Sequence, residues 1–376
     1  MRAQAAPAEP TRFADAVRAA LDGGPALLLG EQEPVSVPEG TAAVVATSGS
    51  TGYPKRVALS AGALRASAAG TATRIGRGRW LLALAPSYVA GLQVVVRSVL
   101  AGSDPVAIAP SSGPAEFAAA ARTLAASGGP LFTSLVPAQL SRLLDADDPA
   151  VIAALASFDA VLVGGQALPP PLADRAQARG VQIVRTYGSS ETSGGCVYDG
   201  VALDGVRVRI AGGEVQVSGQ ILADGYLGDP DRTAAAFPTD PDGTRWYRTG
   251  DTGALDDGML QVTGRRDNVI VSGGVNVSLD RVESAVRSVP GLADAVVVAV
   301  DHDRWGQAPA IAAPGQAEPG DADLLAAARE AAARAIGAPA RPTRLVRLDQ
   351  FPLLTSGKPD RVRIRERIAS GARPLQ

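Results

Sequence analysis

The hydrophobic pattern of the chain changes twice, which divides the chain into three regions of different expected structure. Between about residues 41 and 186, short apolar runs alternate with Ala-rich stretches of helical periodicity. Such alternation is typical of an α/β layer with a largely parallel sheet. The expected strands are 42–46, 80–85, 106–109, 131–134, 160–163 and 181–186, and the expected helices are 64–73, 93–100, 115–126, 138–144 and 172–179.

From about residue 206 to 262, short alternating segments are separated by Gly and Asp pairs. Val206-Arg-Val-Arg-Ile210, for example, is followed by Gly212-Gly213 and then by a second alternating run. Pairs of this kind form tight hairpin turns because glycine adopts positive φ without strain. We therefore expect this region to be antiparallel and rich in β-strands.

A third pattern begins after Gly264-Arg-Arg-Asp267. Its expected elements are strands at 269–272, 295–300 and 343–348, helices at 279–288 and 321–336, and a surface loop at 313–320. The expected fold is α/β, with a large N-terminal body of parallel sheets and a β-rich subdomain over residues 1–266. A small α+β unit over residues 267–376 follows it.

Composition narrows the classes of partner. The chain has 376 residues, of which 46% are hydrophobic and 20% charged, and its formal net charge is −2. No basic face is evident, so we expect small-molecule ligands and no nucleic acid. The single cysteine, Cys196, excludes an intramolecular disulfide and fits a reducing compartment. No long apolar span or signal-peptide core is evident, so we expect no membrane span and a cytoplasmic location.

Lysine is used at only two positions, Lys55 and Lys358, although Lys and Arg together number 36. Both lysines stand beside Gly, Ser and Thr, in Thr47-Ser-Gly-Ser-Thr-Gly-Tyr-Pro-Lys55 and in Thr355-Ser-Gly-Lys358. A lysine is a compact and mobile point charge, whereas arginine is a planar fork. The pattern indicates that both lysines meet a ligand's negative charge, and chance survival of two surface lysines is the alternative.

The segment around Lys55 has the character of a phosphate loop. Backbone N–H groups and hydroxyls that follow a strand can wrap a polyphosphate, and a lysine adds charge. The residues concerned are Thr47, Ser48, Gly49, Ser50, Thr51, Gly52 and Lys55. The segment does not fit the Walker pattern, because Pro54 precedes the lysine and Arg56 follows it. A P-loop NTPase is therefore disfavoured.

Further polar motifs follow in a fixed order. They are Thr186-Tyr-Gly-Ser-Ser-Glu-Thr192, Tyr247-Arg-Thr-Gly-Asp251, Gly264-Arg265 and Lys358. Taken in sequence with the phosphate loop, they resemble the adenylate-forming superfamily of acyl-CoA synthetases, adenylation domains and luciferases. The resemblance spans about residues 41 to 365, and it implies an enzyme that uses ATP, Mg²⁺ and coenzyme A.

Several residues have chemistry that suits a nucleotide. Glu191 can hold Mg²⁺ against phosphates, Ser190 offers a hydroxyl to a phosphate, and Tyr187 offers a flat face to adenine. A polar turn with a solvated glutamate is the alternative for this motif. By the resemblance, Gly164, Gly165 and Gln166 pass beside adenine, and Gly188 of the Thr186–Thr192 motif is a further nucleotide-binding residue. Asp251 can accept both hydrogen bonds of a ribose diol, and a turn or capping carboxylate is the alternative. Arg265 resembles the family's second ribose contact.

The resemblance also assigns roles to the C-terminal region. Lys358 lies in the segment that in this family reaches back to the active site and bridges the carboxylate and the α-phosphate during adenylation. An exposed loop lysine is the alternative. Asp267 resembles the family's hinge residue, or it is an ordinary turn residue. Ser272, Gly273 and Gly274 would then border the tunnel for the pantetheine arm of coenzyme A.

The candidate residues for binding the acyl group lie in the segment Ala85-Pro-Ser-Tyr-Val-Ala-Gly-Leu-Gln-Val-Val-Val-Arg97. It places Gln93 and Arg97 four residues apart on one face of an otherwise apolar helix. A buried arginine needs a partner, and a second carboxylate of the substrate would supply it. The alternatives are a carboxylate of the protein and an arginine that extends to the surface.

With Ser134-Leu-Val-Pro-Ala-Gln-Leu140 and Gly194-Gly-Cys-Val-Tyr-Asp-Gly200, this segment resembles the o-succinylbenzoate-CoA ligases of menaquinone biosynthesis. Many relatives carry a histidine that contacts the substrate where Ser87-Tyr88 stands in this chain. Tyr88 is therefore the candidate for a substrate contact at this position. Cys196, beside two glycines, is expected to pack in the pocket wall and not to act as a nucleophile.

Two further expectations concern assembly and activity. Only about 46 residues precede the phosphate loop, so the usual N-terminal subdomain of the superfamily is largely missing and a second protomer is one candidate to close that side. Adenylation of another aryl or alkyl acid, or transfer to a carrier protein, is the alternative enzyme function. A regulatory nucleotide-binding module is disfavoured because Glu191, Asp251 and Lys358 are all present.

Overall fold

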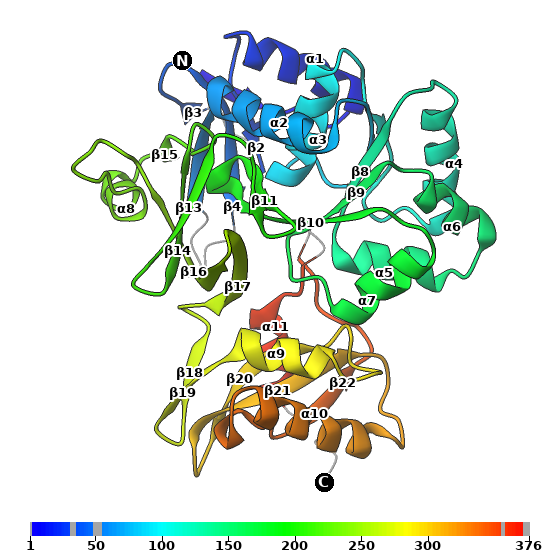
Figure 1. The fold of residues 1–376 in the computed structure, drawn as a ribbon, viewed down its shortest axis with the longest axis vertical. Helices are drawn as coiled ribbons and strands as arrows, with labels where there is room; N and C mark the ends of the chain where they lie inside the picture. The colour runs from blue at the N-terminus through cyan, green and yellow to red at the C-terminus, as the bar shows by residue number, and fades with distance from the viewer. Residues whose placement is uncertain (1, 31–34, 48–54, 355–357, 371–376) are drawn as a thin grey trace.

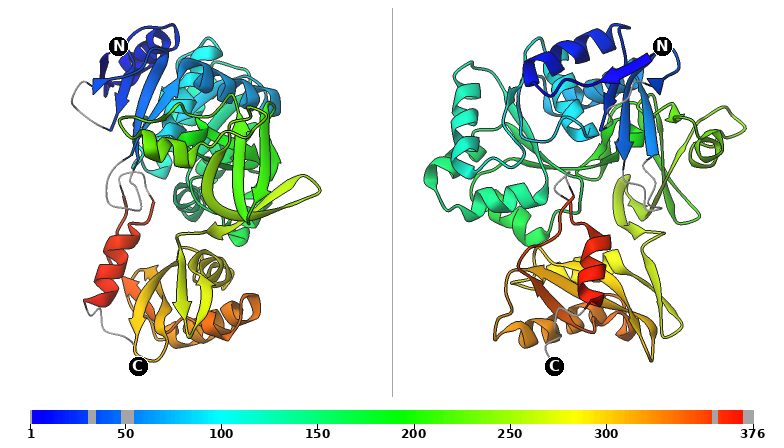
Figure 2. Two further views of the ribbon diagram at one scale, coloured as in Figure 1. Left: turned by 90° about the vertical axis from the view of Figure 1, so that its left-hand side faces the viewer. Right: turned by 180° about the vertical axis from the view of Figure 1, so that it is seen from behind.

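The computed structural model describes residues 2–30, 35–47, 55–354 and 358–370. Figures 1 and 2 show a large body that contains the N-terminus and a smaller unit that contains the C-terminus, joined where strand β17 leads into β18. The mixed α/β architecture of the sequence prediction is confirmed. Within the described residues, no helix has the length and apolar character that crossing a membrane would require.

One sheet of the body has six strands in the order β15-β5-β4-β2-β1-β3. Their bounds are β1 (Arg2–Ala5), β2 (Leu27–Leu29), β3 (Val35–Ser36), β4 (Thr41–Thr47), β5 (Lys55–Ser60) and β15 (Gly225–Tyr226). Strands β1, β2 and β4 are parallel, and the other three are antiparallel to their neighbours. Residues that precede the phosphate loop therefore build much of this sheet, which the sequence analysis had not predicted.

The other large sheet of the body has seven strands in the order β12-β11-β10-β9-β8-β6-β7. Their bounds are β6 (Arg79–Leu82), β7 (Val106–Ala107), β8 (Leu131–Leu135), β9 (Ala160–Val163), β10 (Ile183–Ser189), β11 (Gly194–Tyr198) and β12 (Val201–Ala202). Strands β7, β6, β8, β9 and β10 run parallel, as predicted. Strands β11 and β12 add antiparallel pairs at one edge.

Two layers of helices flank this second sheet. Helices α1 (Pro10–Leu21), α2 (Ala61–Ile75) and α3 (Val89–Leu100) share one apolar core with strands of both sheets, so they lie between the sheets. Helices α4 (Pro114–Ala125), α5 (Pro137–Asp145), α6 (Pro149–Ala156) and α7 (Pro170–Ala178) share a second core with the opposite face. Nearly every side of α3 is buried, as expected for a helix that is apolar all round.

A four-stranded antiparallel sheet completes the body, as the hairpin pattern predicted. It contains β13 (Val206–Ala211), β14 (Glu214–Gly219), β16 (Tyr247–Asp256) and β17 (Met259–Arg265), with helix α8 (Pro230–Ala236) between β14 and β16 in sequence. Gly212 and Gly213 both have positive φ in the β13–β14 turn, which a two-residue hairpin requires.

The smaller unit has a five-stranded sheet covered on both faces. Its elements are β18 (Val269–Ser272), β19 (Val275–Ser278), β20 (Val296–His302), β21 (Gly306–Pro314), β22 (Leu345–Leu348), α9 (Leu279–Arg287), α10 (Asp321–Ala335) and α11 (Arg361–Ala369). One core lies under α9 and α10, and the other lies under α11. Strand β21 was not predicted, because its many alanines do not produce a clear alternation of hydrophobicity.

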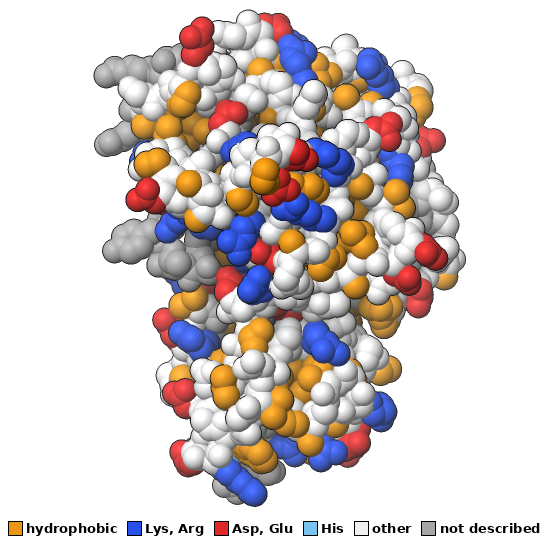
Figure 3. Space-filling model, turned by 60° about the vertical axis from the view of Figure 1, so that its left-hand side comes forward, with side chains coloured by type: hydrophobic (Ala, Val, Ile, Leu, Met, Phe, Trp, Pro, Cys, Tyr) orange, Lys and Arg blue, Asp and Glu red, His pale blue; other side chains and the backbone are white. Residues whose placement is uncertain are grey.

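Charges of both signs are distributed over the surface. Figure 3 shows that Lys and Arg side chains on one face are interspersed with Asp and Glu side chains. The described part of that face therefore presents no continuous basic band.

Candidate active site

Two neighbouring parallel strands end together at the centre of the body. Strand β9 ends at Val163 and leads into Gly164 and Gly165, while β10 carries Tyr187 and Gly188 near its end. Ligands of open α/β sheets bind at the carboxyl ends of such strands. The fold therefore brings together residues that the sequence analysis grouped only by resemblance. Gln166 follows directly and is half-buried.

Close backbone approach explains the glycines at this place. A β-carbon on Gly164 would lie 2.2 Å from Thr186 Oγ1, and one on Gly188 would lie 2.1 Å from the carbonyl oxygen of Gly194. Neither distance is physically attainable, so any larger residue would displace the ends of β9 or β10.

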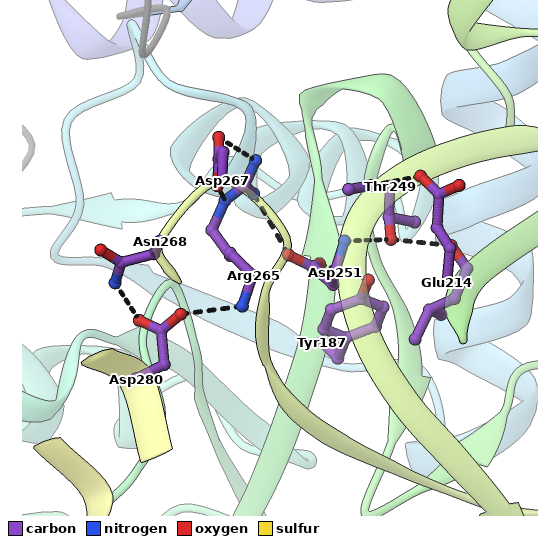
Figure 4. Close-up of polar contacts among 10 residues, drawn as sticks. Tyr187, Glu214, Thr249, Asp251, Arg265, Asp267, Asn268 and Asp280 are labelled. Carbon is purple, nitrogen blue, oxygen red and sulfur yellow. Dashed lines mark hydrogen bonds and ion pairs between the residues drawn. The ribbon is translucent and has the colours of Figure 1, made fainter. Parts of the chain in front are cut away.

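Asp251 is the centre of a hydrogen-bonded group that Figure 4 shows. The Tyr187 hydroxyl donates to Asp251 Oδ2 at 2.6 Å, and Arg265 Nη1 donates to Oδ1 at 3.1 Å. Burial raises the pKa of Asp251, while the hydrogen bond from Tyr187 and the charge of Arg265 lower it. Strands β16 and β17 pair Asp251 with Arg265 in register, so the antiparallel sheet itself aligns the acid with its partner.

The part of strand β16 that carries Asp251 is fixed by two residues that the sequence analysis missed. Thr249 Oγ1 donates to the Val215 carbonyl at 2.8 Å and accepts the Asp251 N–H at 3.0 Å. The buried carboxylate of Glu214 accepts the Gly250 N–H at 3.1 Å. Thr249 could have been found from its place in the Thr-Gly-Asp motif, but Glu214 comes from strand β14 and carries no local signal.

Arg265 also connects the body to the smaller unit. Its guanidinium donates to both oxygens of Asp267 at 2.8 and 3.2 Å, and its backbone N–H donates to Asp280 Oδ2 at 2.8 Å. Asn268 donates to the other oxygen of Asp280 at 2.7 Å. The hydrogen bonds that Arg265 donates to Asp267 raise the pKa of Arg265 above its usual range. Asp280 in helix α9 thus joins the end of β17 to the smaller unit (Figure 4).

Glu191 lies in the short 3₁₀ helix η1 (Ser190–Thr192), where Ser190 and Glu191 are both buried. The hydroxyl of Tyr226 donates to Glu191 Oε1 at 3.0 Å. Lys55 Nζ lies 5.2 Å from the centre of the Tyr226 ring, because β15 pairs with β5 and places Tyr226 beside the start of β5. Tyr226 was not predicted, since only this strand pairing brings it to the site.

The phosphate loop itself is described only at its two ends. Thr47 Oγ1 lies 3.5 Å from the Lys55 carbonyl oxygen. The predicted residues Ser48, Gly49, Ser50, Thr51 and Gly52 lie outside the described residues. Among the residues that are described, no three His, Cys, Asp or Glu side chains gather as a metal site, so Glu191 stands as a single candidate ligand.

Lys358 reaches the body from the smaller unit. A β-carbon built on Gly165 would lie 3.3 Å from Lys358 Cε and 3.9 Å from Nζ. The residue as a whole is exposed, but protein atoms crowd its ammonium end. This desolvation lowers the pKa of Lys358, and the charge of Arg265 lowers it further. The second lysine of the chain is therefore placed beside the glycines at the end of β9.

The candidate acyl residues lie along α3. Tyr88 precedes the first turn and is half-buried. Gln93 is fully buried, its Cγ would lie 3.1 Å from a β-carbon on Gly194, and its Oε1 has no hydrogen-bond partner among the described residues. Helix α3 thus runs beside strand β11, which is paired to β10.

Arg97 is buried without a carboxylate within the described part of the chain. It is 8% exposed, its Nη2 donates to the Tyr198 hydroxyl at 3.3 Å, and its guanidinium lies 5.2 Å from the centre of the Trp80 ring. Its Nε has no partner there. Burial lowers the pKa of Arg97. The alternative of an arginine that extends to the surface is therefore wrong, and the described residues supply no protein carboxylate for it.

The residues predicted to contact coenzyme A do not lie among the candidate nucleotide and acyl residues. Ser272 is buried at the end of β18, and a β-carbon on Gly273 would lie 2.5 Å from the Trp305 ring. With Gly274 they form the β18–β19 turn, and Figure 1 shows this hairpin pointing away from the body. Their assignment stays a prediction.

Cys196 is fully buried on β11, and burial raises the pKa of its thiol to about 12. At pH 8 only about 10⁻⁴ of such a thiol is ionised, and the thiolate is the reactive form. We expect iodoacetamide at pH 8 to leave the folded protein unmodified under conditions that alkylate the urea-unfolded protein, as intact mass would measure. Rapid alkylation of the folded protein would contradict both the burial and the raised pKa.

Comparison with known families defines the class of the protein. The model of the AMP-binding enzyme family matches residues 3–227, and the model of the AMP-binding enzyme C-terminal domain matches residues 281–358. The first match covers more than half of the chain. The chain therefore belongs to the AMP-binding enzyme family, and the resemblance to adenylate-forming enzymes is confirmed.

The chain is also similar to individual proteins of this family. The chain is 44% identical over 354 residues to the "Probable 2-succinylbenzoate--CoA ligase" of Mycobacterium tuberculosis, covering 92% of this chain and 88% of that one. It is 31% identical over 301 residues to the 2-succinylbenzoate--CoA ligase of Geobacillus kaustophilus, covering 72% and 58%. The fold is similar to that of the o-succinylbenzoate CoA synthetase of Bacillus subtilis in complex with the acyl-adenylate intermediate OSB-AMP, with a TM-score of 0.72, 23% identity, and coverage of 94% and 80%.

Proposed function

We propose that the chain is an ATP-dependent acid–thiol ligase that converts 2-succinylbenzoate to its coenzyme A thioester through an acyl-AMP intermediate. The observation that carries this proposal is the buried guanidinium of Arg97, which has no carboxylate partner within the described residues. A buried charge of this kind is costly unless an opposite charge compensates it. A substrate with two carboxylates leaves one for activation and one for Arg97, and the relatives named above support this substrate.

The proposed first step takes place in the body, residues 1–266, with Lys358 of the smaller unit beside Gly165. A carboxylate oxygen of the acid attacks the α-phosphorus of ATP, and pyrophosphate leaves. Tyr187, Gly164, Gly165, Gln166 and Gly188 would enclose adenine, since they lie at the carboxyl ends of β9 and β10, where ligands of open α/β sheets bind.

The ribose and phosphate contacts follow from the polar groups. Asp251 and Arg265 would bind the ribose hydroxyls, Ser190 would donate to a phosphate, and Lys55 and the phosphate loop would hold the departing pyrophosphate. The buried carboxylate of Glu191 suits Mg²⁺, which prefers oxygen ligands and is usually held by one or two carboxylates together with substrate phosphates. When bound, Mg²⁺ would neutralise part of the charge on the phosphates.

The second step forms the thioester. The thiolate of coenzyme A attacks the acyl carbonyl carbon, and AMP leaves. Residues 267–376 would act as a mobile lid that turns about Asp267. Such a turn must break the hydrogen bond between the Arg265 N–H and Asp280, because these two residues lie on opposite sides of Asp267. It would bring Ser272, Gly273 and Gly274 toward the active site in place of Lys358.

The direct test measures products. The purified chain is incubated with Mg²⁺, ATP, coenzyme A and 2-succinylbenzoate, and pyrophosphate, AMP and the thioester are quantified by enzyme-coupled assay and mass spectrometry. We expect equal amounts of all three. Absence of the thioester with 2-succinylbenzoate would overturn the proposal. Turnover of other acids in a panel, or pyrophosphate release without consumption of coenzyme A, would favour the alternative acid or carrier-protein function.

Replacing Tyr226 with phenylalanine tests the Glu191 site. The change removes the hydroxyl that donates to Glu191 but keeps the ring that packs near Phe237. We expect the Mg²⁺ concentration for half-maximal pyrophosphate release to rise by about ten- to 100-fold, since a hydrogen bond to a charged group contributes about 1.5–3 kcal/mol and about 1.4 kcal/mol is a factor of ten. Excess Mg²⁺ should restore the rate, and the melting temperature should change little. An unchanged Mg²⁺ dependence would exclude Tyr226 from this role.

A further inference from the structure

We propose that Tyr198 and Thr71 form a hydrogen-bond relay that positions the Arg97 guanidinium and thereby sets the preference for acids with a second carboxylate. This inference rests on the proposed function. It assigns two positioning residues, neither of which touches the reacting atoms.

The relay connects Arg97 on helix α3 with strand β11 and helix α2. Tyr198 ends strand β11 and is fully buried, and its hydroxyl lies 2.9 Å from Thr71 Oγ1 and 3.3 Å from Arg97 Nη2. Thr71 is buried in helix α2, and its Oγ1 lies 3.1 Å from the Ser67 carbonyl oxygen. The contacts thus run from Arg97 on α3 through Tyr198 on β11 to Thr71 on α2.

The direction of every hydrogen bond in the relay follows from the chemistry of its ends. The Ser67 carbonyl can only accept and the Arg97 guanidinium can only donate. If Thr71 donated to Tyr198, the Tyr198 proton would face only Arg97, which cannot accept it. Thr71 therefore donates to Ser67, Tyr198 donates to Thr71, and the remaining lone pairs of Tyr198 accept from Arg97.

This arrangement holds the guanidinium without cancelling its charge. The relay consists of two hydroxyl groups and contains no carboxylate, and the guanidinium carbon of Arg97 lies 5.2 Å from the centre of the Trp80 ring. A protein carboxylate in the place of Tyr198 would form an ion pair and neutralise the site. The relay instead leaves the positive charge and the unpartnered Nε of Arg97 for a ligand anion.

A purely structural role for the two hydroxyls makes a different prediction. If Tyr198 and Thr71 only filled the core, their loss would lower stability and reduce activity equally with all acids. If they position Arg97, their loss should weaken only the binding of acids whose second carboxylate meets Arg97. The two roles are therefore separated by comparing 2-succinylbenzoate with an analogue in which the carboxylate that is not activated is replaced by an amide.

The experiment compares Tyr198→Phe, Thr71→Val and Thr71→Ser with the unchanged chain. We expect Tyr198→Phe to raise the KM for 2-succinylbenzoate about tenfold, with kcat within about twofold and the KM for ATP unchanged. Thr71→Val should raise it about threefold, because the relay loses its second member, and Thr71→Ser should restore the original KM. The KM for the amide analogue should stay within about twofold in all variants.

Thr73→Val is the matched control. Thr73 lies on the exposed side of α2, and its hydroxyl donates to the Ala69 carbonyl at 3.2 Å, as that of Thr71 does to Ser67. We expect no change in any constant. An unchanged KM in Tyr198→Phe, or equal losses with both acids, would overturn the relay alone. Absence of turnover by the unchanged chain would overturn the proposed function and the relay with it.

Discussion

Replacing Lys358 with alanine is expected to slow acyl-AMP formation by about 10²- to 10³-fold, the usual effect of removing one preorganised group that stabilises developing charge. Lys358 Nζ lies beside Gly165 at the end of β9, next to the residues proposed to hold the nucleotide. Its lowered pKa reflects partial desolvation, and a partly desolvated ammonium interacts more strongly with phosphate than one in bulk water.

The two half-reactions separate this role from a general defect. Acyl-AMP formation is measured by pyrophosphate release, and thioester formation is measured from supplied acyl-AMP and coenzyme A. We expect the second rate to stay within about threefold, because Lys358 would leave the site when the lid turns. Arg365→Ala, which removes an exposed cation from helix α11, serves as the control. Equal loss of both half-reactions would contradict the assignment.

Replacing Arg97 with alanine is expected to lower kcat/KM for 2-succinylbenzoate by about 10²- to 10³-fold. Loss of one partner of a buried, hydrogen-bonded charge pair costs about 2–5 kcal/mol, and in this case the substrate carboxylate would be left without its partner. The KM for ATP should not change. With the amide analogue the loss should be far smaller, which steady-state kinetics with both acids would measure.

Replacing Arg97 with lysine tests whether charge alone is sufficient at this position. A lysine keeps the charge but lacks the planar, multi-donor guanidinium that donates to Tyr198 while its carbon lies 5.2 Å from the centre of the Trp80 ring. We expect it to recover only part of the lost kcat/KM. Melting temperatures of both variants check that the fold persists. An unchanged preference for the dicarboxylic acid in Arg97→Ala would remove Arg97 from the acyl site.

Much of the fold followed from local pattern. The parallel strands of the seven-stranded sheet and the hairpins of the antiparallel sheet were predicted, because alternation and turn residues are properties of short segments. Strand β6 ends at Leu82, earlier than expected, and helix α6 and strand β21 were missed. These are short or Ala-rich segments, whose structure depends on what they pack against.

For the same reason, only some residues of the candidate site were predicted. Tyr187, Glu191 and Asp251 stand in motifs whose residues are adjacent in sequence, so they were found. Tyr226, Glu214 and Tyr198 were not, because each reaches the site only through strand pairing or through contact with a distant helix. Tyr226 and Glu214 have no neighbours in sequence that would mark them as functional, and the segment 194–200 was singled out without a role for Tyr198.

The amino-acid sequence by itself determined the family, the order of its motifs and the unusual retention of two lysines. The tertiary structure decided which groups meet: it placed Lys358 of the smaller unit against Gly165 of the body, and it buried Arg97 beside the Tyr198 hydroxyl. The physical reason is the distance along the chain over which each determinant acts. Helical periodicity, turn chemistry and loop composition act over a few residues, whereas the charge state and partners of a buried side chain depend on packing between elements far apart in the chain.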